Sequence, residues 1–215
     1  MLCFFGEQSE GERAIKIFND LVEANDDIGW VAKFEENFDT WMGWHGDMTD
    51  AVGGSSFISS RLIPIDNFAT EESKQTLAET LVATKGGLFN HVAGKGVMEG
   101  DPNHETSVTP AWRQAVTHYC LTNSNAPRSA TVAEFTTKME AATDLMQPLR
   151  DITPNSGAYW NESDINEPNW EQTFWGDNYE ALKEIKARYD PHRMFRVWNG
   201  VGGARPETGA EAMDF

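Results

Sequence analysis

Residues 156–201 read SGAYWNESDINEPNWEQTFWGDNYEALKEIKARYDPHRMFRVWNGV. Within this stretch, residues 178–189 have the apolar spacing of an amphipathic helix, and Pro191 ends it because a proline restricts the backbone before it. Four of the chain's eight tryptophans lie here. Tryptophans serve most often as core packing, but these could also form the wall of a ligand cavity. The stretch therefore predicts a packed, aromatic segment that covers part of a larger fold.

Working outward, we find apolar runs with strand character that alternate with helical spacing. This order predicts an α+β fold, an antiparallel sheet with helices packed on one face. The bare face then needs a cover, which can be a ligand, another domain or a second copy of the chain. We expect one domain over residues 1–203 and a flexible tail over 204–215. The predicted strands are 2–5, 28–34, 55–65, 88–97 and 111–122. One predicted helix begins near residue 9, and three others span 70–83, 131–149 and 178–189.

The composition restricts the partners of the chain. A net charge of −17 repels phosphate, which argues against nucleic acid and acidic membrane surfaces as ligands. The two cysteines, Cys3 and Cys120, are too few for a disulfide framework and are expected to be buried, inert thiols. The start of the chain lacks the features of a signal peptide, and no apolar run is long enough to cross a membrane. These features favour a soluble protein of the cytoplasm.

Several separated blocks resemble the fungal branch of the berberine-bridge-enzyme-like, FAD-linked oxidases. The sequence SRLIP at residues 60–64, PAWR at 110–113 and SGAYWNE at 156–162 are similar to blocks of that family, in the same order. EPNW at 167–170 and WGDNY at 175–179 continue the pattern. The resemblance covers roughly residues 2–203 and is specific because several ordered blocks agree.

The resemblance implies a substrate domain whose antiparallel sheet faces the isoalloxazine ring in a complete oxidase. It also implies that Tyr159 and Asn161 would lie beside that ring. The flavin-binding half of the family, with its glycine-rich diphosphate loop, has no counterpart in this sequence. We therefore expect a shortened descendant without a cofactor, and the alternative is an FAD-dependent fragment or subunit.

Candidate site residues follow from these blocks and from residue chemistry. Tyr159, Arg61, His118 and His45 are the predicted catalytic groups, because a phenol, a guanidinium or an imidazole can donate to a carbonyl or developing oxyanion. For Arg61, His118 and His45, the alternative to a catalytic role is a structural role in the core. No histidine pair has metal-ligand spacing, so no metal site is predicted. The predicted substrate contacts are Trp44, Trp112, Tyr119, Asn161 and Glu162.

Three functions remain open from the sequence. The first is a cofactor-independent cyclase or isomerase of secondary metabolism, a Diels–Alderase-like enzyme that closes a ring in a bulky apolar precursor. Such a reaction needs a shaped cavity and a few donors more than it needs a redox group. The second is an FAD-dependent oxidoreductase fragment, and the third is a non-catalytic small-molecule binding module. Under the first and third functions we expect a homodimer that covers the exposed sheet face.

Overall fold

The computed structural model describes residues 7–27, 39–40, 42–43, 57–101, 105–121 and 129–203. The chain forms two compact units, Met1–Val52 and Gly53–Phe215. In the first unit, helix α1 (Gln8–Glu23) confirms the helix predicted from residue 9, and Glu10 lies in its first turn, where the helix dipole favours an acidic group. The strands predicted at 2–5 and 28–34 lie outside the described residues.

The second unit contains a three-stranded antiparallel sheet in the order β1-β3-β2. Its strands are β1 (Ser59–Pro64), β2 (Leu88–His91) and β3 (Ala115–Leu121). The central strand β3 is buried at every position except Val116, which is half-buried, whereas the short edge strand β2 is exposed. The fold is α+β, as the sequence predicted.

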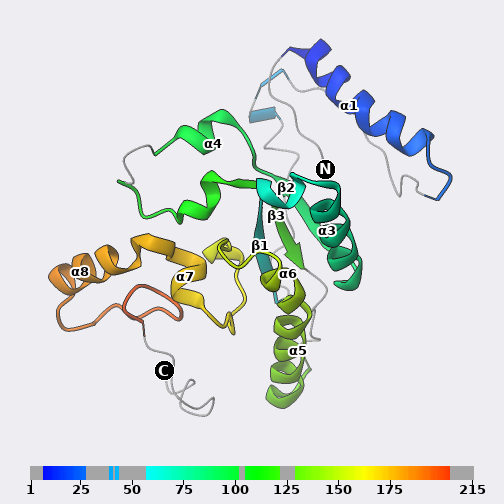
Figure 1. Ribbon diagram of the computed structural model, residues 1–215. Helices are drawn as coiled ribbons and strands as arrows, with labels where there is room; N and C mark the ends of the chain where they lie inside the picture. Colours follow the sequence, from blue (N-terminus) through cyan, green and yellow to red (C-terminus); the bar gives the residue numbers. More distant parts are fainter. Residues whose placement is uncertain are drawn as a thin grey trace. The chain divides into compact units, whose positions relative to one another are not determined.

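One face of this sheet is covered by helices α3 (Glu71–Ala83), α5 (Val132–Leu145) and α6 (Gln147–Asp151), which lie beside the strands in Figure 1. Alternate strand residues point to this face, because successive side chains of a strand point to opposite sides. Their apolar side chains form the core with residues of the helices. The buried members of this core are Ile63, Leu77, Tyr119, Leu121, Met146 and Leu149.

Helices α3 and α5 begin one residue after the start of the predicted ranges, because a threonine caps each of them. Thr70 and Thr131 each form a capping box, in which the threonine hydroxyl accepts from the backbone amide three residues later and that residue's side chain accepts in return. The single helix predicted over 131–149 is instead divided into α5 and α6. The division has a simple cause, since Pro148 has no amide to continue the backbone ladder of α5.

The strand predicted over 88–97 ends at His91, which corrects the prediction. The amides of Val92 and Ala93 both donate to the Val116 carbonyl, so the ladder ends in an irregularity. Similarly, the strand predicted from residue 111 begins only at Ala115. The remaining elements are the α-helices α4 (Lys95–Glu99), α7 (Trp170–Trp175) and α8 (Tyr179–Tyr189), and the 3₁₀ turns η1 (Ile65–Phe68), η2 (Pro110–Arg113), η3 (Trp160–Glu162) and η4 (Gly176–Asn178).

Among the described residues, no helix is both long enough and apolar enough to cross a membrane.

Candidate functional site

The sheet face opposite the core carries two adjacent polar side chains of β3. His118 and Cys120 are two residues apart, so they point to the same side of the strand. Opposite them in register lie Leu62 and Ser60 of β1 on one flank and Asn90 of β2 on the other. His118 and Cys120 are almost fully buried, at 2% and 3% exposure. The centre of the sheet is therefore a polar patch within a largely apolar strand.

A backbone segment on the outer edge of β1 brings a second group of side chains to this face. The amide of Leu62 donates to the carbonyl of Gly157 at 2.8 Å, and the hydroxyl of Ser156 donates to the carbonyl of Leu62 at 2.6 Å. A side chain at residue 157 would place its Cβ 2.5 Å from the carbonyl oxygen of Thr173. Glycine is thus required for the segment to run between β1 and α7. Tyr159 and the turn η3 follow directly.

The far end of this loop is fixed by a buried cluster of four charges. Arg150 donates to both oxygens of Glu167, at 2.8 to 3.1 Å, and to Asp164 at 3.0 Å. Arg61 lies 3.8 Å from Glu167 and donates to Thr153. Two guanidiniums balance two carboxylates, so the cluster carries no net charge into the interior. Burial lowers the pKa of Arg61 to about 10, although neighbouring Glu167 opposes the shift.

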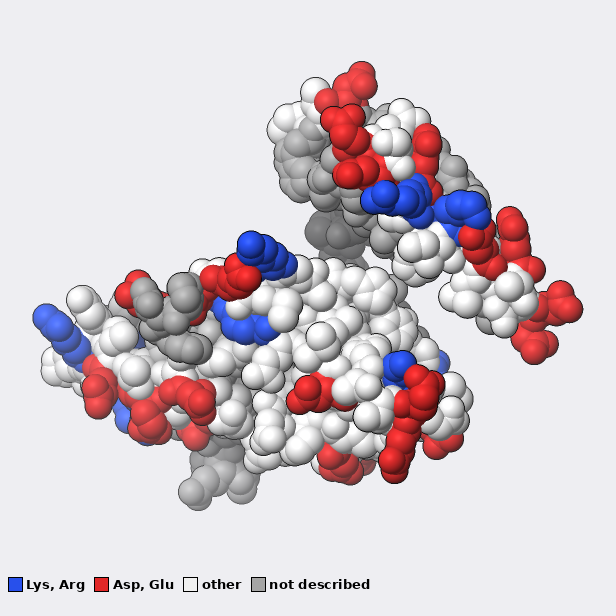
Figure 2. Space-filling view, turned by 45° about the horizontal axis from the view of Figure 1, so that its top comes forward, with Lys and Arg blue, Asp and Glu red and all other residues white. Residues whose placement is uncertain are grey.

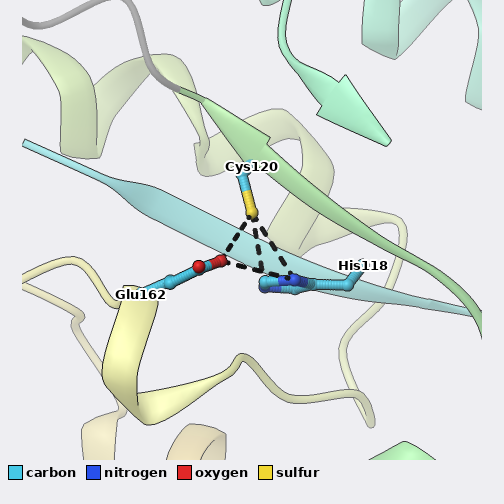
Figure 3. A group of neighbouring side chains, drawn as sticks. All are labelled: His118, Cys120 and Glu162. Atoms are coloured by element: carbon cyan, nitrogen blue, oxygen red, sulfur yellow. Dashed lines mark hydrogen bonds and ion pairs between the residues drawn. The ribbon is translucent and has the colours of Figure 1, made fainter. Parts of the chain in front are cut away.

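Figure 3 shows the group that results, in which Glu162 of η3 points toward His118 and Cys120 of β3. The Cys120 thiol donates to Glu162 Oε2 at 3.3 Å, and its sulfur lies 3.5 Å from each ring nitrogen of His118. His118 Nδ1 lies 3.7 Å from Glu162 Oε2. One ligand atom from each of the three side chains can be chosen so that the three atoms lie within 4.8 Å of one another.

Burial determines the charge of this group. Desolvation raises the pKa of the Cys120 thiol to about 12, and the nearby Glu162 carboxylate adds to the effect. Desolvation also lowers the pKa of His118, while Glu162 acts in the opposite direction. At neutral pH the group therefore contains a neutral imidazole and a protonated thiol.

Aromatic rings form a wall around His118. The ring centroids of Trp112 and Tyr159 each lie close to the imidazole, at 5.6 and 5.7 Å, and 5.6 Å from each other. Both pairs that involve Tyr159 are edge-on. The Tyr159 side chain is 38% exposed, so one side of this wall faces outward. Such a surface can hold an apolar molecule and present a phenol to it.

The structure brings four of the residues predicted from the sequence together: Trp112, His118, Tyr159 and Glu162. It does not bring Arg61 or Tyr119 to this group. These two face each other across the strands on the helix-covered side, where the Tyr119 hydroxyl contacts Thr84 and donates to the Gly86 carbonyl.

Asn161 is exposed within η3, and Trp44 and His45 lie outside the described residues. Cys120, expected to be an inert thiol, is a central member of the group. A sequence signal for it exists, since two ligand-type residues separated by one position in a strand share a face.

Two cavities among the described residues are lined by side chains other than His118, Cys120 and Glu162. One, of about 360 Å³, lies between α3 and β2 and is lined by Leu81, Val82, Gly86, Gly87, Phe89 and Tyr119. The other, of about 210 Å³, lies beside α5 and includes Phe57, Phe135 and Ile165. His118 and Cys120 themselves are almost fully buried, so this group reaches the solvent only through the partly exposed Tyr159 and Glu162.

Comparison with known proteins identifies the relatives of this fold. Residues 158–202 match the family described as "Berberine and berberine like". The chain is 33% identical to the FAD-linked oxidoreductase patO of Aspergillus clavatus over 143 residues, which is 66% of this chain and 25% of that protein. The chain is thus similar to part of a berberine-bridge-like, FAD-linked oxidoreductase. The resemblance seen in the sequence is confirmed.

Two further relatives extend this picture. The bifunctional decalin synthase calF of Penicillium decumbens is 32% identical over 152 residues, which is 67% of this chain and 26% of that protein. The VAO-type flavoprotein MtVAO713 of Myceliophthora thermophila has the same fold over 94% of this chain and 37% of its own, with a TM-score of 0.80 and 24% identity. The chain spans about a quarter of the length of the two curated relatives.

The flavin that these relatives imply can be tested against the residues present. A planar ring system needs aromatic and polar contacts on one side, and Trp112, Tyr159 and His118 are groups of that kind, with their rings inclined by 47° to 81° to one another. A dinucleotide also needs a phosphate cradle, and this sequence has no glycine-rich diphosphate loop. This chain therefore supplies aromatic and polar groups but no counterpart of a diphosphate cradle.

Proposed function

We propose that the chain is a cofactor-independent cyclase of secondary metabolism, which closes a ring in a bulky apolar precursor on the sheet face around His118. The observation that carries this proposal is the convergence of three aromatic rings, Trp112, His118 and Tyr159, at centroid distances of 5.6 to 5.7 Å. These rings come from three separate segments, so the wall they form is a product of the tertiary fold.

The proposed reaction is an intramolecular cycloaddition of a polyene with an activated alkene. Two carbon–carbon σ bonds form from π electrons, and no atom, proton or electron enters or leaves. The aromatic wall holds the folded substrate in a conformation close to that of the transition state, which lowers the entropic part of the barrier. The Tyr159 phenol donates a hydrogen bond to the carbonyl that activates the alkene, where negative charge increases in the transition state.

The electrostatics of the face suit such a substrate. Because burial lowers the pKa of His118, the imidazole beneath the wall is neutral and presents no charge to an apolar ligand. A relative named bifunctional decalin synthase gives further support, since a decalin is a fused pair of rings. The substrate class that follows is a linear polyene with a conjugated carbonyl.

The test uses the purified chain and a polyene whose conjugated carbonyl activates closure to a decalin. We expect faster closure or a biased stereochemistry compared with buffer. The Y159F variant should lose about 10²- to 10³-fold in rate, because it lacks the donor. Y189F is the matched control, since Tyr189 is 76% exposed and outside the wall. Identical products and rates with and without protein would refute the proposal, and tight binding without turnover would instead indicate a binding module.

A second candidate is the substrate-side part of an FAD-dependent oxidoreductase, which the names of the relatives favour. When bound, FAD would supply hydride acceptance, and Tyr159 and Trp112 would contact the substrate or the ring. The measurement is an absorbance spectrum of the purified protein before and after incubation with FAD and gel filtration. Retained flavin bands would support this candidate, and their absence after incubation would favour the cyclase.

A further inference from the structure

The distances within the group of His118, Cys120 and Glu162 agree with those between the ligands of one metal ion. Tetrahedral Zn²⁺, with bonds of about 2.3 Å to sulfur and 2.0–2.1 Å to nitrogen and oxygen, places its ligand atoms roughly 3.3–3.6 Å apart. The observed separations are 3.5 Å between sulfur and nitrogen, 3.3 Å between sulfur and oxygen, and 3.7 Å between nitrogen and oxygen. Because the sulfur is 3.5 Å from both ring nitrogens, it lies off the lone-pair direction of either one. A single ion can contact all three side chains once the imidazole turns one nitrogen toward it.

The kinds of ligand indicate which ion. One thiolate, one imidazole and one carboxylate form a mixed soft and hard set, which favours a borderline ion such as Zn²⁺ over Mg²⁺ or Ca²⁺. Three protein ligands leave the fourth tetrahedral position for water or substrate, which is the pattern of catalytic rather than structural zinc sites.

The surroundings leave this position accessible and polar. The Glu162 side chain is 41% exposed, whereas that of His118 is 3% exposed, so the group opens on the side of the carboxylate. Ser60 lies directly opposite Cys120 on the same sheet face. Its hydroxyl is buried, at 2% exposure of the residue, and has no hydrogen-bond partner among the described residues. An unpartnered buried hydroxyl is costly, and a metal-bound water would supply the missing partner.

We propose that His118, Cys120 and Glu162 bind a divalent ion of the Zn²⁺ class. Binding displaces the thiol proton, which now lies between Cys120 and Glu162, and releases it to solvent. The ring of His118, which would bind the ion, also packs against the ring of Tyr159. This site goes beyond the proposed cyclase function, in which Tyr159 is the donor to the substrate carbonyl. Metal binding itself does not depend on that function.

The test is a titration of the chelator-treated full chain with Co²⁺, which replaces Zn²⁺ and reports its ligands by colour. We expect a sulfur-to-cobalt charge-transfer band, strong visible bands typical of tetrahedral coordination, and loss of both when Zn²⁺ is added. C120A should abolish the charge-transfer band, and H118A and E162Q should weaken Co²⁺ binding about tenfold or more.

Matched controls remove the same side chains elsewhere. H91A and H192A delete exposed imidazoles, and C3A deletes the other thiol of the chain. All three should bind Co²⁺ as the parent does. Circular dichroism checks that each variant folds. If C120A does not fold, E162Q still tests the site. The proposal is refuted if no cobalt spectrum develops, or if the charge-transfer band persists in C120A and is lost in C3A.

The outcome is separable from that of the cyclase assay. Co²⁺ binding is measured without substrate, and ring closure can be measured in metal-free protein with Y159F as its reference. Loss of the metal site with retained closure would overturn only the metal proposal. If the protein binds metal but does not accelerate ring closure with or without metal, only the cyclase proposal is overturned.

Discussion

At the residue scale, Ser60 within β1 and Ser156 beside it differ in whether the hydroxyl has a hydrogen-bond partner. The Ser156 hydroxyl donates to the Leu62 carbonyl at 2.6 Å, whereas the Ser60 hydroxyl is buried without a partner. We expect S156A to lower the free energy of unfolding by about 1 kcal/mol, and S60A in metal-free protein to leave it unchanged or raise it slightly. Urea denaturation of the two variants measures the difference. A loss in S60A equal to that in S156A would show that Ser60 has a partner.

Tyr179 gives a prediction for alkaline pH. Burial, together with a hydrogen bond to Glu171, raises the pKa of its phenol to about 12. An unfolded tyrosine titrates near 10, so the neutral phenol favours the folded state. This contribution is complete below pH 10 and is lost as the pH rises through 12.

The midpoint of urea unfolding should therefore fall less steeply between pH 10 and 12 in Y179F than in the parent. Other groups titrate in this range, so the comparison between variants is the measurement. Y189F is the control, because Tyr189 is exposed. Equal slopes for the parent and Y179F would contradict the assigned shift.

At the scale of elements, the loop that carries Tyr159 and Glu162 is held in place at both ends. Gly157 pairs with β1 at one end, and the charge cluster of Arg150, Glu167 and Asp164 fixes the other end to α6. Removing one partner of a buried ion pair leaves the other charge uncompensated. The geometry of the site therefore depends on a cluster that lies on the opposite side of the sheet.

We expect R150M to lower the free energy of unfolding by about 3–5 kcal/mol, since Glu167 and Asp164 would lose their main partner. K183M is the matched control, because Lys183 forms an exposed pair with Glu180 at 3.2 Å, and its loss should be about 0–1 kcal/mol. Chemical denaturation measures both. A loss in R150M as small as that in K183M would mean that the cluster contributes little.

For the whole molecule, the net charge of −17 determines which large partners can bind. Figure 2 shows acidic side chains scattered over the visible face of both units and not gathered at one site. We expect no binding to RNA or DNA at about 0.15 M salt, because the field of the protein repels phosphate. A mobility-shift assay measures this, and a shift that weakens with added salt would contradict the prediction.

Self-association stays a prediction from the sequence. The edge strand β2 is exposed, and Tyr159 beside His118 is 38% exposed. A homodimer would cover such a surface. Sedimentation equilibrium of the full chain over a range of concentrations should show a dimer, and a monomer at every concentration would contradict this expectation.

The sequence alone determined the local features. The starts of α3 and α5, the end of strand β1 at Pro64 and the family resemblance all follow from short patterns, because helix starts, prolines and motif blocks act over a few residues. Trp112, His118, Tyr159 and Glu162 were also predicted as site residues, since three lie in blocks of the family and the histidine has suitable chemistry. The break between α5 and α6 was not predicted, because Pro148 interrupts a helical pattern that otherwise runs over residues 131–149.

Only the tertiary structure decided which side chains meet. Alternation along β1 and β3 separates Arg61 and Tyr119 from His118 and Cys120, but it cannot say which side the helices cover. Contacts between segments distant in the sequence decide which side is covered. They place Arg61 near Glu167 in the interior and Cys120 near Glu162, 42 residues away. The reason is physical: the period of a strand is set by neighbouring residues, whereas the identity of each face is set by the segments that pack on it.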